Sequence, residues 1–248
     1  MFSRALNIER DCGRLAALVA PELPNAPATI RVDFGGRAFT EFAKPGETAA
    51  CRAGILRFGG ELVVDIRGPQ SWRPQVPGGR LNKAAWQSLH NIAVRTPMVG
   101  ELKAWPGLGI CLHPDRFSEM PPDRLIGVLE PLVGLGPGLT PAGDDFIAGM
   151  AAALFWSGKG VLLAPHMPGW AARTTDISRW LLLDSLGGQV NAPLCDLAQS
   201  LASDRTAPPA NAVLQLGHTS GAAMILGLLA GYGIAWPDLA AADIGLAA

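Results

Sequence analysis

The sequence predicts an α+β protein with a β-rich N-terminal part and a mostly α-helical C-terminal part. Two observations predict this division. Between residues 29 and 68, apolar and polar residues alternate in short segments that end near glycine or proline, as strands do. From residue 123 onward, apolar residues recur at helical spacing. The turn-rich segment 69–79 predicts a boundary, which gives domains at 1–75 and 76–248.

The N-terminal part is expected to contain one helix and a small sheet. Apolar residues among the first twenty positions have helical spacing and predict a helix over 4–20. Strands are expected at 29–36, 37–43, 51–60 and 61–68, forming a small antiparallel sheet or barrel. The pairs Gly35-Gly36 and Gly59-Gly60 are typical of hairpin turns.

The C-terminal part is expected to be almost entirely helical. Between residues 97 and 122 the pattern is irregular, with room for one more short strand. Periodicity and capping residues predict helices at 82–94, 123–133, 141–157, 174–186, 192–202, 210–215 and 220–232.

Composition and charge exclude several classes of protein. Of the 248 residues, 49% are hydrophobic and 17% are charged, which is typical of a soluble chain with a large core. The net charge of −1 provides no general attraction to nucleic acid or to an anionic membrane. The apolar run that starts near residue 146 is broken at Gly158 and Gly160, so we expect a buried helix there and no membrane span. Four scattered cysteines and the absence of a signal peptide indicate a reducing cytoplasm.

The glycine-rich stretch 134–143 is the most informative motif of the chain. Thr140 suits a helix N-cap and Pro141 suits the first helical position, so a tight loop is expected to lead into a helix. A helix N-terminus has unpaired N–H groups and a partial positive charge that favour anions. Neither a Walker loop nor a GxGxxG dinucleotide fingerprint is present. The alternative interpretation is a helix–helix turn that uses glycine for close packing.

Two adjacent acids, Asp144 and Asp145, follow this loop. Acids in a first turn can simply stabilise the helix dipole. A functional acid here would act as a base, accept a hydrogen bond from a substrate amide, or hold Mg²⁺ through water. Because an acid beside an anion would repel it, amide or metal contact is favoured over direct phosphate contact. No metal-ligand spacing of cysteine and histidine is present.

Two further helix starts carry polar residues, at 217–221 (GHTSG) and at 173–178 (RTTDIS). In the first, Thr219 or Ser220 can cap the helix, and His218 lies just before it. In the second, Arg173 could pair with an anion. If the three starts converge they form one pocket for a small anion, and if they diverge they are only caps. A triad of Ser220, His218 and Asp145 is disfavoured because GHTSG is not a GxSxG elbow.

The run GLGPGLTPAGDDFIAG, followed by RTTDIS and GHTSG, resembles the AllH-like family. The namesake of this family is a subunit of the oxamate carbamoyltransferase complex of allantoin degradation, a branch of purine catabolism. The resemblance is strongest from about residue 132 to residue 231 and looser in the N-terminal half. One difference is that an acid expected shortly after GHTSG is replaced here by Ala223 or its neighbours.

The resemblance implies a transferase subunit that interconverts oxalurate and phosphate with oxamate and carbamoyl phosphate, together with partner protein subunits. A non-catalytic metabolite-binding or scaffold subunit and a stand-alone amidohydrolase are the alternatives. No cofactor is implied beyond the Mg²⁺ considered above. The candidate catalytic residues are Asp144, Asp145 and His218, and the candidate anion-binding residues are Gly136, Gly138, Thr140, Gly143, Arg173, Thr174, Thr219, Ser220 and Gly221.

Overall fold

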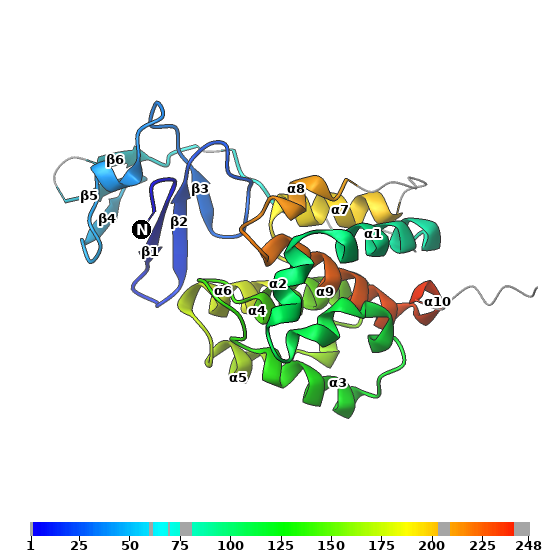
Figure 1. Ribbon diagram of the computed structural model, residues 1–248. Helices are drawn as coiled ribbons and strands as arrows, with labels where there is room; N and C mark the ends of the chain where they lie inside the picture. The colour runs from blue at the N-terminus through cyan, green and yellow to red at the C-terminus, as the bar shows by residue number, and fades with distance from the viewer. Residues whose placement is uncertain (1, 60–61, 69, 75–80, 203–208, 241–248) are drawn as a thin grey trace, which may run out of the picture. The chain divides into compact units, whose positions relative to one another are not determined.

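The computed structural model describes residues 2–59, 62–68, 70–74, 81–202 and 209–240 (Figure 1). The chain forms two compact units, residues 1–73 and 74–248. The first contains two small sheets and the second is helical, so the predicted α+β class is confirmed. Each unit is described by itself below.

The N-terminal unit contains two three-stranded sheets. In the first, β1 pairs antiparallel with β2, and β2 pairs parallel with β3. In the second, β4, β5 and β6 form an antiparallel meander. A small apolar core that includes Leu18, Phe39 and Phe58 stabilises this unit. The strands are β1 (Ala5–Glu9), β2 (Leu15–Val19), β3 (Thr29–Arg31), β4 (Ala49–Arg52), β5 (Ile55–Phe58) and β6 (Leu62–Asp65).

The helix predicted over 4–20 is wrong, because this segment forms the β1–β2 hairpin. The chain reverses at Gly13, whose φ of 77° is readily adopted by glycine and whose N–H donates to the Arg10 carbonyl at 2.7 Å. This reversal places Leu6 opposite Leu18, so apolar residues that fit a helix also fit two paired strands. Gly13 indicated a turn within this segment, but the helical spacing of the apolar residues was given more weight in the prediction.

Three expectations about the remaining strands also need correction. Segment 37–43 contains a 3-10 turn, Phe39–Glu41, in place of a strand. Segment 51–60 is divided between β4 and β5 by a turn in which Ala53 and Gly54 both have positive φ. Gly35 and Gly36 do form a turn, but it leads from β3 into the 3-10 turn and joins no pair of strands. Gly60 lies outside the described residues.

The C-terminal unit contains the helices predicted from periodicity, with small shifts at their ends. In the irregular stretch 97–122, where the sequence left room for a short strand, the structure has α2 and the 3-10 helices Leu108–Leu112 and Pro114–Phe117. The short α5 was not predicted. The helices are α1 (Lys83–Arg95), α2 (Met98–Ala104), α3 (Pro122–Leu129), α4 (Ala142–Trp156), α5 (Met167–Ala171), α6 (Asp176–Ser185), α7 (Ala192–Ala202), α8 (Asn211–Leu214), α9 (Ser220–Ala235) and α10 (Pro237–Ala240).

Helices α4 and α9 pack together in the core of this unit, and Figure 1 shows α9 crossing its middle. A Cβ atom added at Gly227 would clash with the Phe146 carbonyl, and one added at Gly231 would clash with Met150. The two backbones therefore touch through glycine. Since these contacts advance along both helices together, α4 and α9 run in the same direction and their N-termini lie at the same end. Among the described residues, no helix combines the length and apolar character needed to span a membrane.

Candidate functional site

The glycine-rich loop closes tightly on the start of α4. Pro141 occupies the N-cap position with extended backbone, so Thr140 lies one residue too early to cap, which corrects the predicted roles of both residues. The Gly143 N–H donates to the Leu135 carbonyl at 2.9 Å. At Gly136, φ is 121° and an added Cβ would lie 2.8 Å from the Ala142 nitrogen. Packing explains this glycine, whereas Gly138 has φ of 94° and faces open space.

The Asp144 side chain connects the glycine-rich loop to the segment that leads into α6. One carboxyl oxygen accepts from the Gly134 N–H at 2.8 Å, and the other accepts from the Thr174 hydroxyl at 2.5 Å. The following residue, Thr175, caps α6 by accepting from the Ser178 N–H, and its hydroxyl donates to the Leu139 carbonyl at 2.5 Å. These bonds connect the start of α6 to the glycine-rich loop.

The start of α9 is joined to the same loop. The Ser220 and Thr140 hydroxyl oxygens are 3.2 Å apart and share a hydrogen bond across 80 residues of sequence. Thr219 occupies the N-cap position, but neither it nor Ser220 caps the helix through its side chain, contrary to expectation. An added Cβ at Gly221 would clash with the Val213 carbonyl, so this glycine permits close packing against α8. The three polar helix starts therefore lie together, which is the arrangement that one common site requires.

Asp145 has the most unusual environment of these residues. Its side chain is fully buried, and neither carboxyl oxygen has a hydrogen-bond partner. Burial and, to a smaller extent, the nearby charge of Asp144 together raise the pKa of Asp145 from 3.8 to about 8. The hydroxyls of Ser220 and Thr140 face it and act to lower that pKa, but neither reaches it with hydrogen-bond geometry. The raised pKa favours the uncharged form of Asp145 near neutral pH, next to the hydroxyls of Thr140 and Ser220.

Two candidate residues are engaged elsewhere. The His218 ring is 77% exposed, and its Nε2 lies 2.7 Å from Oε1 of Glu101 on α2. Arg173 forms an ion pair with Glu130 at 2.8 Å and also donates to the Glu130 carbonyl. The sequence analysis missed Glu101 and Glu130, because a partner so distant along the chain has no local signal. With Ser220 bonded to Thr140 and His218 to Glu101, the described bonds assemble no Ser–His–Asp triad.

The described residues contain no group of three or more His, Cys, Asp or Glu side chains placed to hold a metal ion. The two adjacent acids have different surroundings: Asp144 is satisfied by Gly134 and Thr174, while Asp145 faces the hydroxyl pair. All four cysteines are free thiols.

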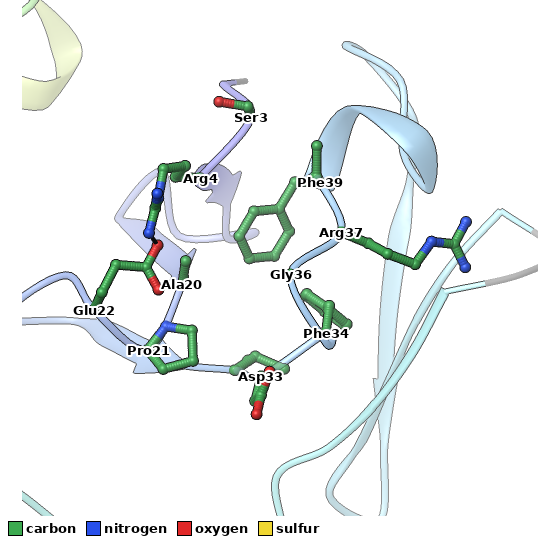
Figure 2. Close-up of a pocket in the computed structure, with 12 residues that line it drawn as sticks. Ser3, Arg4, Ala20, Pro21, Glu22, Asp33, Phe34, Gly36, Arg37 and Phe39 are labelled. Carbon is green, nitrogen blue, oxygen red and sulfur yellow. Dashed lines mark ion pairs between the residues drawn. The ribbon is translucent and has the colours of Figure 1, made fainter.

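A cavity of about 340 Å³ lies within the N-terminal unit (Figure 2). In Figure 2, Arg4 and Glu22 point toward one another on one side of it, and the rings of Phe34 and Phe39 lie on the other. Arg37 points away and pairs with Glu41. The sequence analysis missed this cavity because it assigned the segment 4–20, which contains Arg4 and the β1–β2 hairpin, to a helix.

Comparison with known families divides the chain in the same way as the fold. Residues 132–232 match the model of the oxamate carbamoyltransferase subunit AllH. Residues 1–71 match the model of the AllH family N-terminal domain. Together these matches cover well over half of the chain. The chain belongs to the AllH family. The AllH match begins at the glycine-rich loop and ends within α9, so it includes all three helix starts. No solved structure matches the chain.

Proposed function

We propose that this chain is a subunit of a cytoplasmic carbamoyltransferase complex of allantoin degradation, and that the starts of α4, α6 and α9 form its site for a small anion. The observation that carries the proposal is the Thr140–Ser220 hydrogen bond, which brings together two long parallel helices at their N-termini. The aligned partial positive charges of two such termini favour an anion, while the Gly143 and Gly221 N–H groups already donate to the Leu135 and Leu216 carbonyls. Phosphate, carbamoyl phosphate, oxamate and oxalurate are all anions of suitable size for such a site.

The proposed reaction exchanges one acceptor of a carbamoyl group for another. A phosphate oxygen attacks the ureido carbonyl of oxalurate, the bond from that carbon to the oxamate nitrogen breaks, and the proton of hydrogen phosphate ends on that nitrogen. The products are carbamoyl phosphate and oxamate. Backbone N–H groups near Gly136, Gly138 and Thr140, together with Thr219 and Ser220, would stabilise negative charge on the anion.

A second candidate function is a metabolite-binding subunit whose partners supply the catalytic groups. The internal bonds of Asp144, Arg173 and His218 favour it, since these three candidates already have partners within the chain. In both functions the anion binds at the same place. The two differ in whether substitution at this site lowers turnover or only substrate affinity in the assembled complex.

Thermal unfolding of the isolated chain tests the anion site. Phosphate or oxamate at 100 times its dissociation constant should stabilise the chain by about 2.7 kcal/mol, while chloride at equal ionic strength should not. Ser220→Ala should reduce this stabilisation because the hydroxyl bridge to Thr140 is lost. Ser157→Ala, at the opposite end of α4, is the matched control and should respond like the wild type. If neither anion shifts the melting temperature at millimolar concentration, the proposed site is wrong.

A further inference from the structure

We propose that Asp145 recognises the amide edge of the substrate as an uncharged carboxylic acid, with its O–H donating to the amide oxygen and its C=O accepting from the amide N–H. This inference rests on the proposed function, because it assigns one part of the bound metabolite to one residue of the same site. It also names the chemical class selected there, which is a small anion that carries a carbamoyl or carboxamide group.

The first step is geometric. Both oxygens of Asp145 are buried and lack partners, which folded proteins avoid unless a ligand or water completes the site. They face the hydroxyls of Thr140 and Ser220, whose mutual hydrogen bond joins the N-termini of α4 and α9. A planar carboxyl group with two unsatisfied oxygens is best matched by a planar ligand edge that also presents two hydrogen-bonding atoms.

The second step concerns which edge fits. A protonated carboxyl group offers one donor and one acceptor, and an amide offers one acceptor and one donor in complementary order. A carboxylate or phosphate oxygen pair offers only acceptors, and a urea N–H pair offers only donors. The uncharged acid therefore matches the amide edge best. It also removes the repulsion expected between an acid and an anion held at the helix starts.

The third step concerns the charges around Asp145. The nearest charged group is the Asp144 carboxylate, which is held in position by its hydrogen bonds from the Gly134 N–H and the Thr174 hydroxyl. The sequence of α9 contains no Asp, Glu, Lys, Arg or His. The one titratable group of α9 is Tyr232, whose pKa is raised by burial, as is that of the buried Cys111. Near α6 and the glycine-rich loop, Asp176 pairs with Arg179 and Glu130 pairs with Arg173 at the surface. Asp184, at the far end of α6 from its start, is the further acid of that helix.

Calorimetric titration of the full chain with oxamate and oxalate tests the inference. The two ions have the same shape, but oxamate has one amide edge where oxalate has a second carboxylate. At pH 6.5 oxamate should bind at least about tenfold more tightly, because oxalate leaves the Asp145 carbonyl facing an acceptor. At pH 9.5 both ions should bind more weakly than at pH 6.5, since ionised Asp145 repels an anion and no longer donates to the amide oxygen. Neither ligand titrates in this range.

Asp145→Asn provides the sharper variant, because its amide offers a donor and an acceptor at every pH. It should keep the preference for oxamate and lose the pH dependence. Asp123→Asn, an exposed acid in the first turn of α3, is the matched control and should behave like the wild type. A well-folded Asp145→Asn protein that no longer binds oxamate would overturn the inference.

The outcomes for the unsubstituted chain separate the two proposals. Equal and pH-independent binding of oxamate and oxalate would overturn the role of Asp145 and leave the anion site standing. Binding of neither ion would overturn the anion site itself. Tighter binding of oxalate than of oxamate at pH 6.5 would show that Asp145 does not select an amide edge.

Discussion

Two adjacent acids at the start of α4 show how strongly local surroundings decide the chemistry of a residue. Both side chains are fully buried, but Asp144 accepts two hydrogen bonds and stabilises the loop, whereas neither oxygen of Asp145, one position later, has a hydrogen-bond partner. Adjacent helical side chains point about 100° apart, so the two can have unrelated surroundings. The structural role therefore belongs to Asp144, and Asp145 is the better candidate for contact with substrate.

The burial of Asp145 makes the stability of the protein depend on pH. Its pKa is raised from 3.8 to about 8, so between these values the native state holds a proton that the unfolded chain has lost. The free energy of unfolding should fall as the pH rises from about 4 to about 8, by up to about 1.4 kcal/mol per pH unit, and level off above that. Asp145→Asn should abolish this slope.

Chemical denaturation at several pH values measures the effect as the difference between the wild type and Asp145→Asn, which cancels the other titrating groups. The variant should become relatively more stable as the pH rises. A wild type that gains stability over the variant toward pH 8 would mean that the carboxylate is ionised and partnered.

The sequence predicted those parts of the site that have a local signal, and it missed the contacts between residues far apart along the chain. Thr140, Thr174 and Ser220 could be proposed as neighbours because each lies at a polar helix start within an apolar region. The pairing of His218 with Glu101 joins residues 117 positions apart and depends on the tertiary fold. The same holds for the pairing of Arg173 with Glu130. Such pairs leave no trace in spacing or composition.

At the scale of elements, the parallel contact between α4 and α9 positions the site. Both helices are long and nearly uniformly apolar, and this pattern predicted their existence and extent well. Their glycines are the feature that sequence alone left ambiguous. Gly143 and Gly221 are explained by close backbone contacts with Leu132 and Val213, while their proposed contact with an anion remains a prediction.

Gly227→Ala tests the importance of this helix contact. The added Cβ would clash with the Phe146 carbonyl, so the two helices must separate, and we expect destabilisation of about 1–3 kcal/mol. Gly127→Ala in α3 is the matched control, because no atom lies within 4 Å of the added Cβ. There the better helix propensity of alanine should stabilise the protein by up to about 1 kcal/mol. Equal melting temperatures for the two variants would show that the helix contact is loose.

The N-terminal elements were predicted less well for a physical reason. Strands of three to five residues contain too few apolar positions to distinguish a period of two from a helical one. Turn residues carry the decisive information, as Gly13 and the Ala53-Gly54 pair show. The segments 55–58 and 62–65 were placed correctly within predicted strands because their alternation is clear, with Leu56, Phe58, Leu62 and Val64 all buried.

At the scale of the whole molecule, each unit matches its own family model, and the proposed site lies entirely within the helical unit. We therefore expect substitution at this site to change catalysis in the assembled complex without changing assembly. Ser220→Ala should lower turnover of oxalurate and phosphate by about 10²-fold if its hydroxyl stabilises charge in the transition state. Steady-state kinetics of the reconstituted complex measures this, with Ser157→Ala as control. A raised KM with unchanged kcat would favour the metabolite-binding subunit.

The most direct measurement is a crystal structure of the full chain grown with oxamate at pH 6.5. The carboxylate of oxamate should lie against the N-termini of α4 and α9, beside Thr140 and Ser220, with its amide edge on the carboxyl group of Asp145. Oxamate bound in the cavity of the N-terminal unit, or a saturated crystal with no ligand at these helix starts, would contradict the proposed site.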